Sequence, residues 1–270
     1  MTNQAPVILW FRQDLRLDDN PALNAAAESG RPVVPVFIHD EDNAGEWAPG
    51  PASQWWLHHS LKRLKRLIRE TGAHAVYWNR GYEPWKIARD KKIKSGLSVE
   101  GKSFDAQLMF EPWTVQTGSG QPYKVFTPFY KACLNLDGVS APLRAHRDLN
   151  FGSRPESAMR LEDHGLRPKS RRAKKLEQYW QPGEEGAWKR FRKFKKEIMP
   201  HYAELRDRPD KDGTSALSPH LHWGEISPRA LWHGVGDRCE AFTRELCWRE
   251  FCYHLLYHFP DFPEESFKQN

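Results

Sequence analysis

The chain has 270 residues, a length that predicts one large domain or two small ones with enough residues to bury a sizeable core. Hydrophobic residues make up 39% of it and charged residues 28%, which is typical of a globular protein and excludes a disordered one. The formal net charge of +6 permits an anionic partner without requiring one. No apolar run approaches the ~20 residues that cross a bilayer, and the run 7–11 is too short for a secretory signal, so we expect no membrane contact.

Two residue types stand out. Cys133, Cys239, Cys247 and Cys252 form neither a C-x-x-C pair nor a metal-ligand spacing, so we expect free thiols and a cytoplasmic location. Tryptophan is unusually frequent, with 12 Trp against 8 Tyr. A tryptophan is expected where its large face packs on something.

Short apolar runs alternate with helical patterns through the first half. The runs predict buried strands over 7–11, 33–38 and 75–78 and a fourth strand over 102–105. Between them, apolar spacing predicts helices over 21–29, about 52–70 and 84–95, and another that begins at 127. This alternation predicts an α/β fold, with a mostly parallel sheet covered by helices on both faces.

Proline after a small polar residue indicates several helix starts. We expect Asn20, Thr127, Ser218 and Ser227 to be N-caps, each with proline at the first helical position. Phosphate-binding loops are missing: there is no G-x-x-x-x-G-K-[ST], and Gly118-Ser-Gly120 lacks the third glycine of a dinucleotide fingerprint. That segment is predicted to be a plain loop.

The second half changes character. Residues 136–186 carry irregular Pro and Gly and read as a long connection, and the remainder, including a long helix over 240–258, reads as all-α. Between 165 and 200, twelve basic residues face only four acidic ones, an excess larger than that of the whole chain. The apolar stripe Trp188, Phe191, Phe194 and Ile198 favours a solvated helix face, whereas the charge favours a surface that contacts nucleic-acid phosphates.

Six motifs occur in order along nearly the whole chain. They are W-F-R-Q-D-L-R-L-D-D-N-P-A-L (10–23), G-E-W-A-P-G (45–50), W-N-R-G-Y-E-P-W (78–85), Y-K-V-F-T-P-F (123–129), G-T-S-A-L-S-P-H-L-H-W-G-E-I-S-P-R (213–229) and E-L-C-W-R-E-F-C-Y-H-L-L-Y-H-F-P (245–260). With them the chain resembles the DNA photolyase/cryptochrome family, and class I deoxyribodipyrimidine photolyases in particular.

The resemblance implies a Rossmann-like α/β antenna domain over 1–135, a connector over 136–186 and the first part of an all-helical FAD-binding domain over 187–270. It implies light-dependent repair of pyrimidine dimers by electron transfer from reduced FAD. The partner would be UV-damaged DNA, and the protein is expected to be a monomer. A second antenna chromophore, a folate or a deazaflavin, would lie against the α/β domain.

The resemblance also implies roles for individual residues. Glu245 and Trp248, three residues apart on a helix and so on one face, would line the lesion pocket. Trp248 would stack on the flipped dimer, Glu245 would hydrogen-bond a pyrimidine and Arg206 would contact a DNA phosphate. The flavin phosphates would be bound by Tyr202, Thr214, Ser215, Leu217, Ser218 and Arg249. Structural alternatives are a core Trp with a rim Glu, and a plain helix cap at Ser218.

Other residues are expected to be structural. Glu250 is interpreted so, and the histidines at 220, 222, 254 and 258 are interpreted as packing or surface residues, since no set of carboxylates or cysteines completes a metal site. Ala216 departs from the family pattern, which usually has a basic residue there.

Family members continue past the W-R-E-F helix with further flavin-binding helices, and usually have another strand and helix between Glu70 and Ala73. The chain therefore resembles a C-terminally truncated, internally shortened relative that would bind flavin poorly. Two alternatives to a repair enzyme stay open: a cryptochrome-like blue-light photoreceptor and a non-catalytic remnant.

Overall fold

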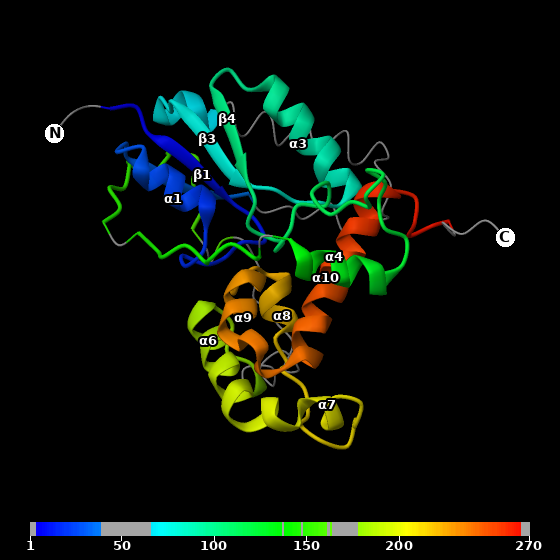
Figure 1. Cartoon of the computed structure of the whole chain (residues 1–270). Helices are drawn as coiled ribbons and strands as arrows, with labels where there is room; N and C mark the ends of the chain where they lie inside the picture. Colours follow the sequence, from blue (N-terminus) through cyan, green and yellow to red (C-terminus); the bar gives the residue numbers. More distant parts are fainter. Residues whose placement is uncertain are drawn as a thin grey trace.

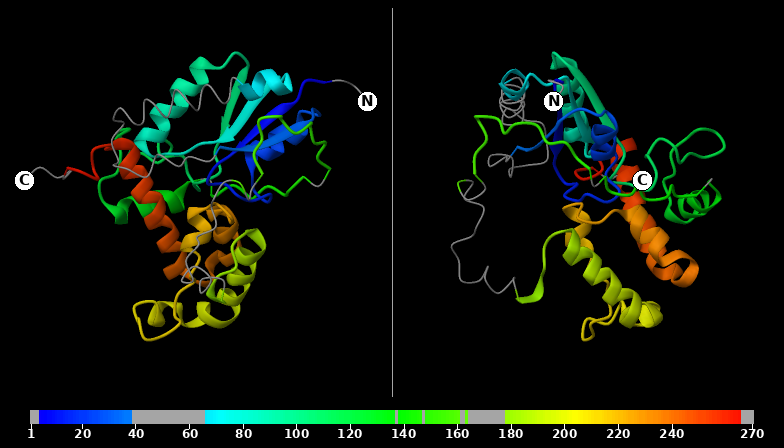
Figure 2. Two further views of the ribbon diagram at one scale, coloured as in Figure 1. Left: turned by 180° about the vertical axis from the view of Figure 1, so that it is seen from behind. Right: turned by 90° about the vertical axis from the view of Figure 1, so that its left-hand side faces the viewer.

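The computed structural model describes residues 4–38, 66–136, 138–146, 148–160, 163 and 178–265. The motif at 45–50, most of the expected helix over 52–70 and the basic residues between 167 and 175 lie outside these residues. The described structure has a parallel sheet flanked by helices and a group of helices at one end of that sheet (Figures 1 and 2).

Four parallel strands form the sheet in the order β2-β1-β3-β4. Their bounds are β1 Val7–Phe11, β2 Val33–Phe37, β3 Ala75–Asn79 and β4 Glu100–Phe104. The register places Val7 opposite both Val33 and Ala75. The expectation of a parallel sheet is therefore confirmed, with β1 and β3 at its centre.

Helices cover both faces of the sheet, as predicted. Helix α1 (Pro21–Glu28) packs Leu23 and Ala26 against one face of β1 and β3. On the other face, Ile93 of α3 (Pro84–Gly96) lies among Ile8, Trp10 and Trp78. Alternate residues of each central strand thus enter opposite hydrophobic clusters, the arrangement that wholly apolar strands predict.

Two strand predictions need correction. The strand over 33–38 was expected to be buried on both faces, but β2 lies at the sheet edge, where Pro35 is exposed and Phe37 is 47% exposed. The fourth strand begins at Glu100 rather than Lys102, because it pairs with β3 through polar residues that carry no apolar signal.

The prediction that the polar residue before a proline is an N-cap is confirmed at two helices and wrong at two. Asn20 accepts the N–H of Leu23, and Ser227 accepts the N–H of Ala230 at 2.9 Å, so both are N-caps. Helix α4 (Phe126–Asn135) instead begins before Thr127 with Val125 at its N-cap, and α8 (Ser218–His222) begins with Ser218 itself. Neither of these helices has a side-chain cap, so the N-cap predictions at Thr127 and Ser218 are wrong.

Past the connection, in the described residues 178–265, every regular element is a helix. These elements are α6 (Glu184–Lys193), the π-helix η2 (Phe194–Ile198), η3 (Met199–His201), α7 (Tyr202–Leu205), α8, α9 (Pro228–Val235), η4 (Gly236–Arg238) and α10 (Glu240–His258). Phe191, Phe194 and Ile198 are buried here, as the apolar stripe indicates. Helix α4 joins the same core, and its Phe129 and Cys133 lie in one cluster with Phe251 of α10.

The segment after α4 returns along the sheet. Val33 donates to the carbonyl of Asn150 and accepts from the N–H of Gly152, so the returning chain pairs with the start of β2. The Gly118-Ser-Gly120 segment is a turn, in which the N–H of Gly120 donates to the carbonyl of Thr117. No helix within the described ranges is long and apolar enough to span a membrane.

Candidate functional site

A buried polar network closes the ends of the central strands. Asn79, the last residue of β3, donates from Nδ2 to Asp14 Oδ2 at 2.6 Å and to Asn20 Oδ1 at 2.7 Å. The N–H of Arg12 donates to Asp14 Oδ1 at 2.6 Å. These bonds fix the loop between β1 and α1, and the D-L-R-L-D-D-N motif therefore has a structural role here.

A cavity of about 700 Å³ opens beside this loop, at the carboxyl ends of the parallel strands. Open α/β sheets place ligand sites at this edge. Residues from β1, α3 and the helical half contribute to the wall, including Trp10, Arg12, Trp85, Arg89 and Trp223. The cavity therefore has both aromatic and cationic walls.

The cations of the cavity lie over its indole rings. The Arg89 guanidinium is 5.4 Å from the Trp10 ring centroid and 5.1 Å from that of Trp85. Arg12 lies 4.9 Å from the Trp10 ring and pairs with Asp90 at 2.8 Å. Such a wall suits a flat ligand with negative charge, which can stack on indole and pair with guanidinium.

Lys86 adds a buried ammonium group. Its Nζ donates to Glu83 Oε1 at 2.6 Å and to the side-chain carbonyl of Gln13, while burial lowers the pKa of Lys86. The other oxygen of Glu83, Oε2, is buried and has no protein partner within the described residues. This orphaned acceptor beside the cavity wall can take a hydrogen bond from a ligand.

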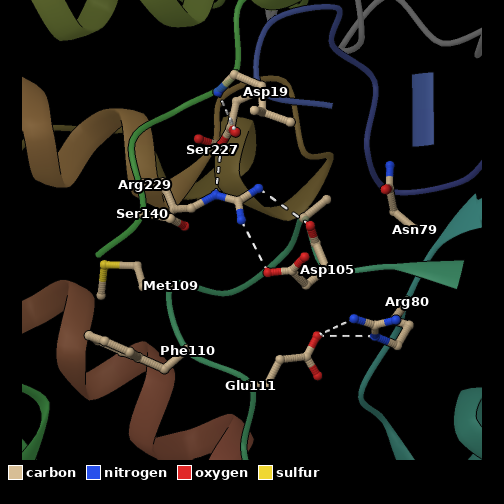
Figure 3. A network of polar contacts seen from close by, with 12 residues as sticks. Asp19, Asn79, Arg80, Asp105, Met109, Phe110, Glu111, Ser140, Ser227 and Arg229 are labelled. Carbon is tan, nitrogen blue, oxygen red and sulfur yellow. Dashed lines mark hydrogen bonds and ion pairs between the residues drawn. The ribbon is translucent and has the colours of Figure 1, made fainter. Parts of the chain in front are cut away.

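Ionic contacts join the two halves next to the cavity (Figure 3). Arg229 of α9 donates from Nε to Asp19 Oδ2 at 3.0 Å and from Nη1 to Asp105 Oδ2 at 3.2 Å. Arg16 is buried and donates to the carbonyls of Asp19, Ala106 and Gly224, and its burial lowers the pKa of the guanidinium to about 10. Arg80 pairs with Glu111, with Nη2 and Oε1 2.6 Å apart, and the same view shows this pair.

The outer face of α10 brings together three residues to which the resemblance gave roles. Glu245 Oε1 accepts from Arg206 Nη1 at 2.6 Å, and this bond raises the pKa of Arg206. Trp248, one turn further along, is 41% exposed. The structure thus places Glu245, Trp248 and Arg206 on one accessible surface.

The ring of Trp248 is stacked on Phe126, the first residue of α4. Their centroids are 3.6 Å apart and their planes differ by 9°. Phe251 meets the indole from the side at 5.9 Å and 71°. Phe126 is a residue that the sequence reasoning missed, although it lies in the V-F-T-P motif.

The residues expected to bind flavin phosphate separate into groups. Thr214 and Ser218 are exposed, and their hydroxyls make no hydrogen bond within the described residues, while Ser215 Oγ accepts from the N–H of Leu217 at 3.4 Å. Leu217 itself is buried. Ala216 adopts φ +50°, which turns the chain sharply here. Free hydroxyls on a tight turn are a donor set that fits a phosphate group.

Tyr202 and Arg249 are held elsewhere. Tyr202 is buried against Phe194 and Phe242. Arg249 donates from Nη1 to the carbonyl of Gln107 at 2.9 Å and to Glu250 Oε1 at 3.1 Å. In this structure the Arg249 guanidinium thus joins α10 to the segment after β4.

Glu250 has the structural position expected of it. Its Oε2 accepts the backbone N–H groups of Met109 at 2.7 Å and Phe110 at 3.2 Å. Complete burial raises the pKa of Glu250 to about 7, although Arg249 opposes this effect. The carboxyl group therefore holds two backbone donors where α10 packs on the segment that follows β4.

The histidines are also engaged in packing contacts. His220 Nδ1 lies 2.5 Å from Glu225 Oε2 in a buried pair. Burial and the nearby His258 lower the pKa of His254 to about 4, so its neutral ring accepts the N–H of Tyr123 at Nε2. The described residues contain no cluster of His, Cys, Asp or Glu that could hold a metal, and all four cysteines are free.

Half of the basic run lies within the described residues, on α6 and η2. Lys193 pairs with Asp212 at 3.2 Å, and the Arg190 guanidinium lies 5.0 Å from the Trp180 ring. Several of the charges thus already have partners on the protein surface, as a solvated helix face implies.

The family model for DNA photolyase matches residues 7–70 and 62–146, which together are more than half of the chain. The chain belongs to the DNA photolyase family. The deoxyribodipyrimidine photo-lyase of Agrobacterium fabrum is 42% identical over 98% of this chain and 62% of its own length. Cryptochrome-1 of Arabidopsis thaliana is 32% identical over 88% of this chain and 39% of its own.

A photolyase structure has the same fold. The bacterial class III photolyase from Agrobacterium tumefaciens has a TM-score of 0.86 and 41% identity, over 98% of this chain and 61% of that one. The family prediction is confirmed, although the sequence motifs were matched above to class I and this structure is of class III. The chain spans about three fifths of the length of these photolyase relatives.

Proposed function

We propose that the chain serves the light-dependent repair of pyrimidine dimers in UV-damaged DNA. The observation that carries this proposal is the exposed indole of Trp248, beside Glu245 and Arg206, on a chain of the DNA photolyase family. A base that leaves the DNA stack needs an aromatic face and hydrogen bonds to its edge. This surface offers both.

Each of the three residues has a distinct task in this proposal. Trp248 stacks on the flipped dimer. Glu245 Oε1 faces Arg206, which leaves the second oxygen of the carboxylate to accept the N3–H of a pyrimidine. Arg206 contributes a permanent positive charge close to DNA phosphates.

FAD fits the hydroxyl groups that precede α8. Thr214, Ser215 and Ser218 would hold its diphosphate, since their hydroxyls lie on one tight turn and two of them are free within the described residues. A reduced FAD held there would supply, on excitation by light, the electron for splitting of the dimer. Leu217 contributes backbone to this turn. Tyr202 and Arg249 would have to leave their present contacts to reach the same group.

The cavity at the strand ends fits a second chromophore. The cavity wall holds two indoles with guanidinium groups over them, a buried ammonium and the free Glu83 oxygen. This set of groups matches a planar ligand with carboxylate groups, which would be a folate or a deazaflavin.

The division proposed for the chain is an α/β domain over 1–135, a connector over 136–186 and part of a helical domain over 187–270. The cavity lies where the first and third of these meet.

Flavin retention tests the proposal first. The full chain is incubated with FAD, freed of excess flavin and examined by visible absorption. The double variant Thr214→Ala/Ser218→Ala should weaken FAD binding, whereas Ser119→Ala, an exposed hydroxyl on a distant turn, should not.

Illumination with blue light in the presence of a reductant should then remove dimers from an oligonucleotide. Flavin binding without repair would favour the photoreceptor alternative. A chain that retains no flavin would contradict the proposal and favour the non-catalytic remnant.

A further inference from the structure

The indole of Trp248 has one covered face. Phe126 lies parallel to it with ring centroids 3.6 Å apart. Phe126 is only 5% exposed, whereas Trp248 is 41% exposed. The stack therefore buries one side of the indole and leaves a large part of the ring in solvent.

Phe126 is in turn contacted by one residue of α4, Tyr130, and one residue of α10, Arg244. Tyr130, four residues later on α4, lies nearly parallel to Phe126, with centroids 5.8 Å apart and planes 16° apart. The guanidinium of Arg244 on α10 lies 5.3 Å from the Phe126 ring and 5.4 Å from the Tyr130 ring. Because Arg244 and Trp248 are also four residues apart, a pair on α10 interlocks with a pair on α4.

Because Phe126 is buried and Trp248 is partly exposed, their contact can affect ligand binding as well as packing. A half-exposed tryptophan on a helix surface ordinarily samples several rotamers, and a ligand that stacks on it must first order it. Contact with a buried ring removes that freedom in advance. A ring fixed by one face and accessible at the other is preorganised for stacking.

We propose that Phe126 is the positioning residue for Trp248 and holds the indole plane ready to stack on an unpaired pyrimidine base. The inference rests on the proposed function, in which Trp248 contacts the lesion. It assigns to α4, the last helix of the proposed α/β domain, an influence on lesion recognition. Phe126 acts through Trp248 and does not touch the base.

The ring orientation can be measured without DNA. The full chain is labelled with 5-fluorotryptophan, and the ¹⁹F resonance of Trp248 is assigned by its loss in Trp248→Phe. Phe126→Leu keeps an apolar side chain but removes the ring, so the Trp248 resonance should move toward that of the free amino acid and sharpen. Phe126→Tyr should restore it.

A second phenylalanine on the same helix supplies a matched control. Phe129 is buried against Phe251 and His254 and makes no ring contact with Trp248 among the described residues. Phe129→Leu should leave the Trp248 resonance in place. Circular dichroism and thermal unfolding of every variant identify those that lose the fold. An unmoved Trp248 resonance in folded Phe126→Leu would overturn the proposal.

DNA binding then separates this inference from the proposed function. The readout is the ratio of the Kd for an undamaged oligothymidylate to the Kd for the same strand with one thymine dimer. We expect Phe126→Leu to reduce this ratio roughly fivefold or more, with the Kd for undamaged DNA unchanged, and Phe126→Tyr to preserve it.

Trp248→Ala is the companion variant. If it lowers the ratio and Phe126→Leu does not, the positioning role is refuted while the lesion contact stands. If Trp248→Ala has no effect, or if the parent chain does not discriminate between the two strands, the lesion contact fails and the stacking role of Phe126 fails with it.

Discussion

Arg229 donates from Nε to Asp19 Oδ2 at 3.0 Å, and the two residues, 210 positions apart in the chain, are 4% and 0% exposed. Asp19 also accepts the N–H of Leu143 at 3.0 Å, and its backbone adopts φ +51°. One carboxylate therefore joins the β1–α1 loop, the connector and α9. This junction fixes the helical half relative to the sheet.

Removal of one partner from the Arg229–Asp19 pair should lower the free energy of unfolding strongly. Arg229→Met leaves the Asp19 carboxylate buried without its cation, and we expect a loss of about 3–5 kcal/mol in the free energy of unfolding. Urea denaturation measures the change. Asp105→Asn is the matched control, because Asp105 contacts the same guanidinium but is 42% exposed at its side chain, so its loss should cost about 1 kcal/mol or less. Equal effects of the two variants would contradict the importance given to the buried pair.

Glu250 predicts a specific pH dependence. Burial raises the pKa of Glu250 from 4.5 to about 7 in the folded chain, so its contribution to stability is fully present below pH 4.5 and is lost as the pH rises through 7. Glu250→Gln cannot ionise. Relative to the parent, the unfolding free energy of this variant should improve by about 2–3 kcal/mol between pH 5 and pH 8. Urea denaturation at the two pH values tests this, and a difference that does not change with pH would refute it.

Gly224 lies where two chain segments meet. A Cβ at this position would lie 2.1 Å from the backbone oxygen of Gln13, and the residue has φ +67°. Gly224→Ala must therefore displace backbone as well as strain φ, and should cost more than the ~1 kcal/mol typical of a glycine with positive φ alone. Gly30→Ala is the control, with φ +68° and open space around the new carbon. Thermal unfolding of the two variants should rank Gly224→Ala as clearly less stable.

The two Ser-Pro pairs should respond differently to the same substitution. Ser227 Oγ accepts the N–H of Ala230, so Ser227→Ala should cost about 1 kcal/mol, the usual value of an N-cap bond. Ser218 makes no such bond, and Ser218→Ala should change stability by less than about 0.5 kcal/mol. Chemical denaturation of the pair gives the comparison, and a large effect at Ser218 would contradict the cap assignment in the structure.

The difference between those serines indicates what the sequence could and could not predict. Asn20 and Ser227 were found because the cap bond is local, and β1 and β3 because residues 7–11 and 75–78 are all apolar. Thr127 and Ser218 satisfy the same local rule, yet α4 begins two residues and α8 one residue earlier than it implies. Phe126 and Leu217, at those starts, are buried in the helical core, and no pattern of neighbouring residues reports such tertiary packing.

The candidate site shows the same limit. Spacing placed Glu245 and Trp248 on one face of α10, and the structure agrees. The stacking of Trp248 on Phe126 joins residues 122 positions apart, and the pairing of Arg206 with Glu245 joins residues 39 apart. Arg249 was expected to reach flavin phosphate, but its contacts with Gln107 and Glu250 depend on a segment whose path the sequence does not reveal.

The return of the connector to β2 has a consequence for solubility. An edge strand offers unpaired N–H and C=O groups to a second chain, which makes it a place for aggregation to begin. At Val33 both groups are already bonded to Asn150 and Gly152. Two residues further, Pro35 has no N–H to offer, and proline is tolerated in a sheet at such an edge. The connector and one proline together protect the β2 edge of this sheet, at Val33 and Pro35, from edge-to-edge association.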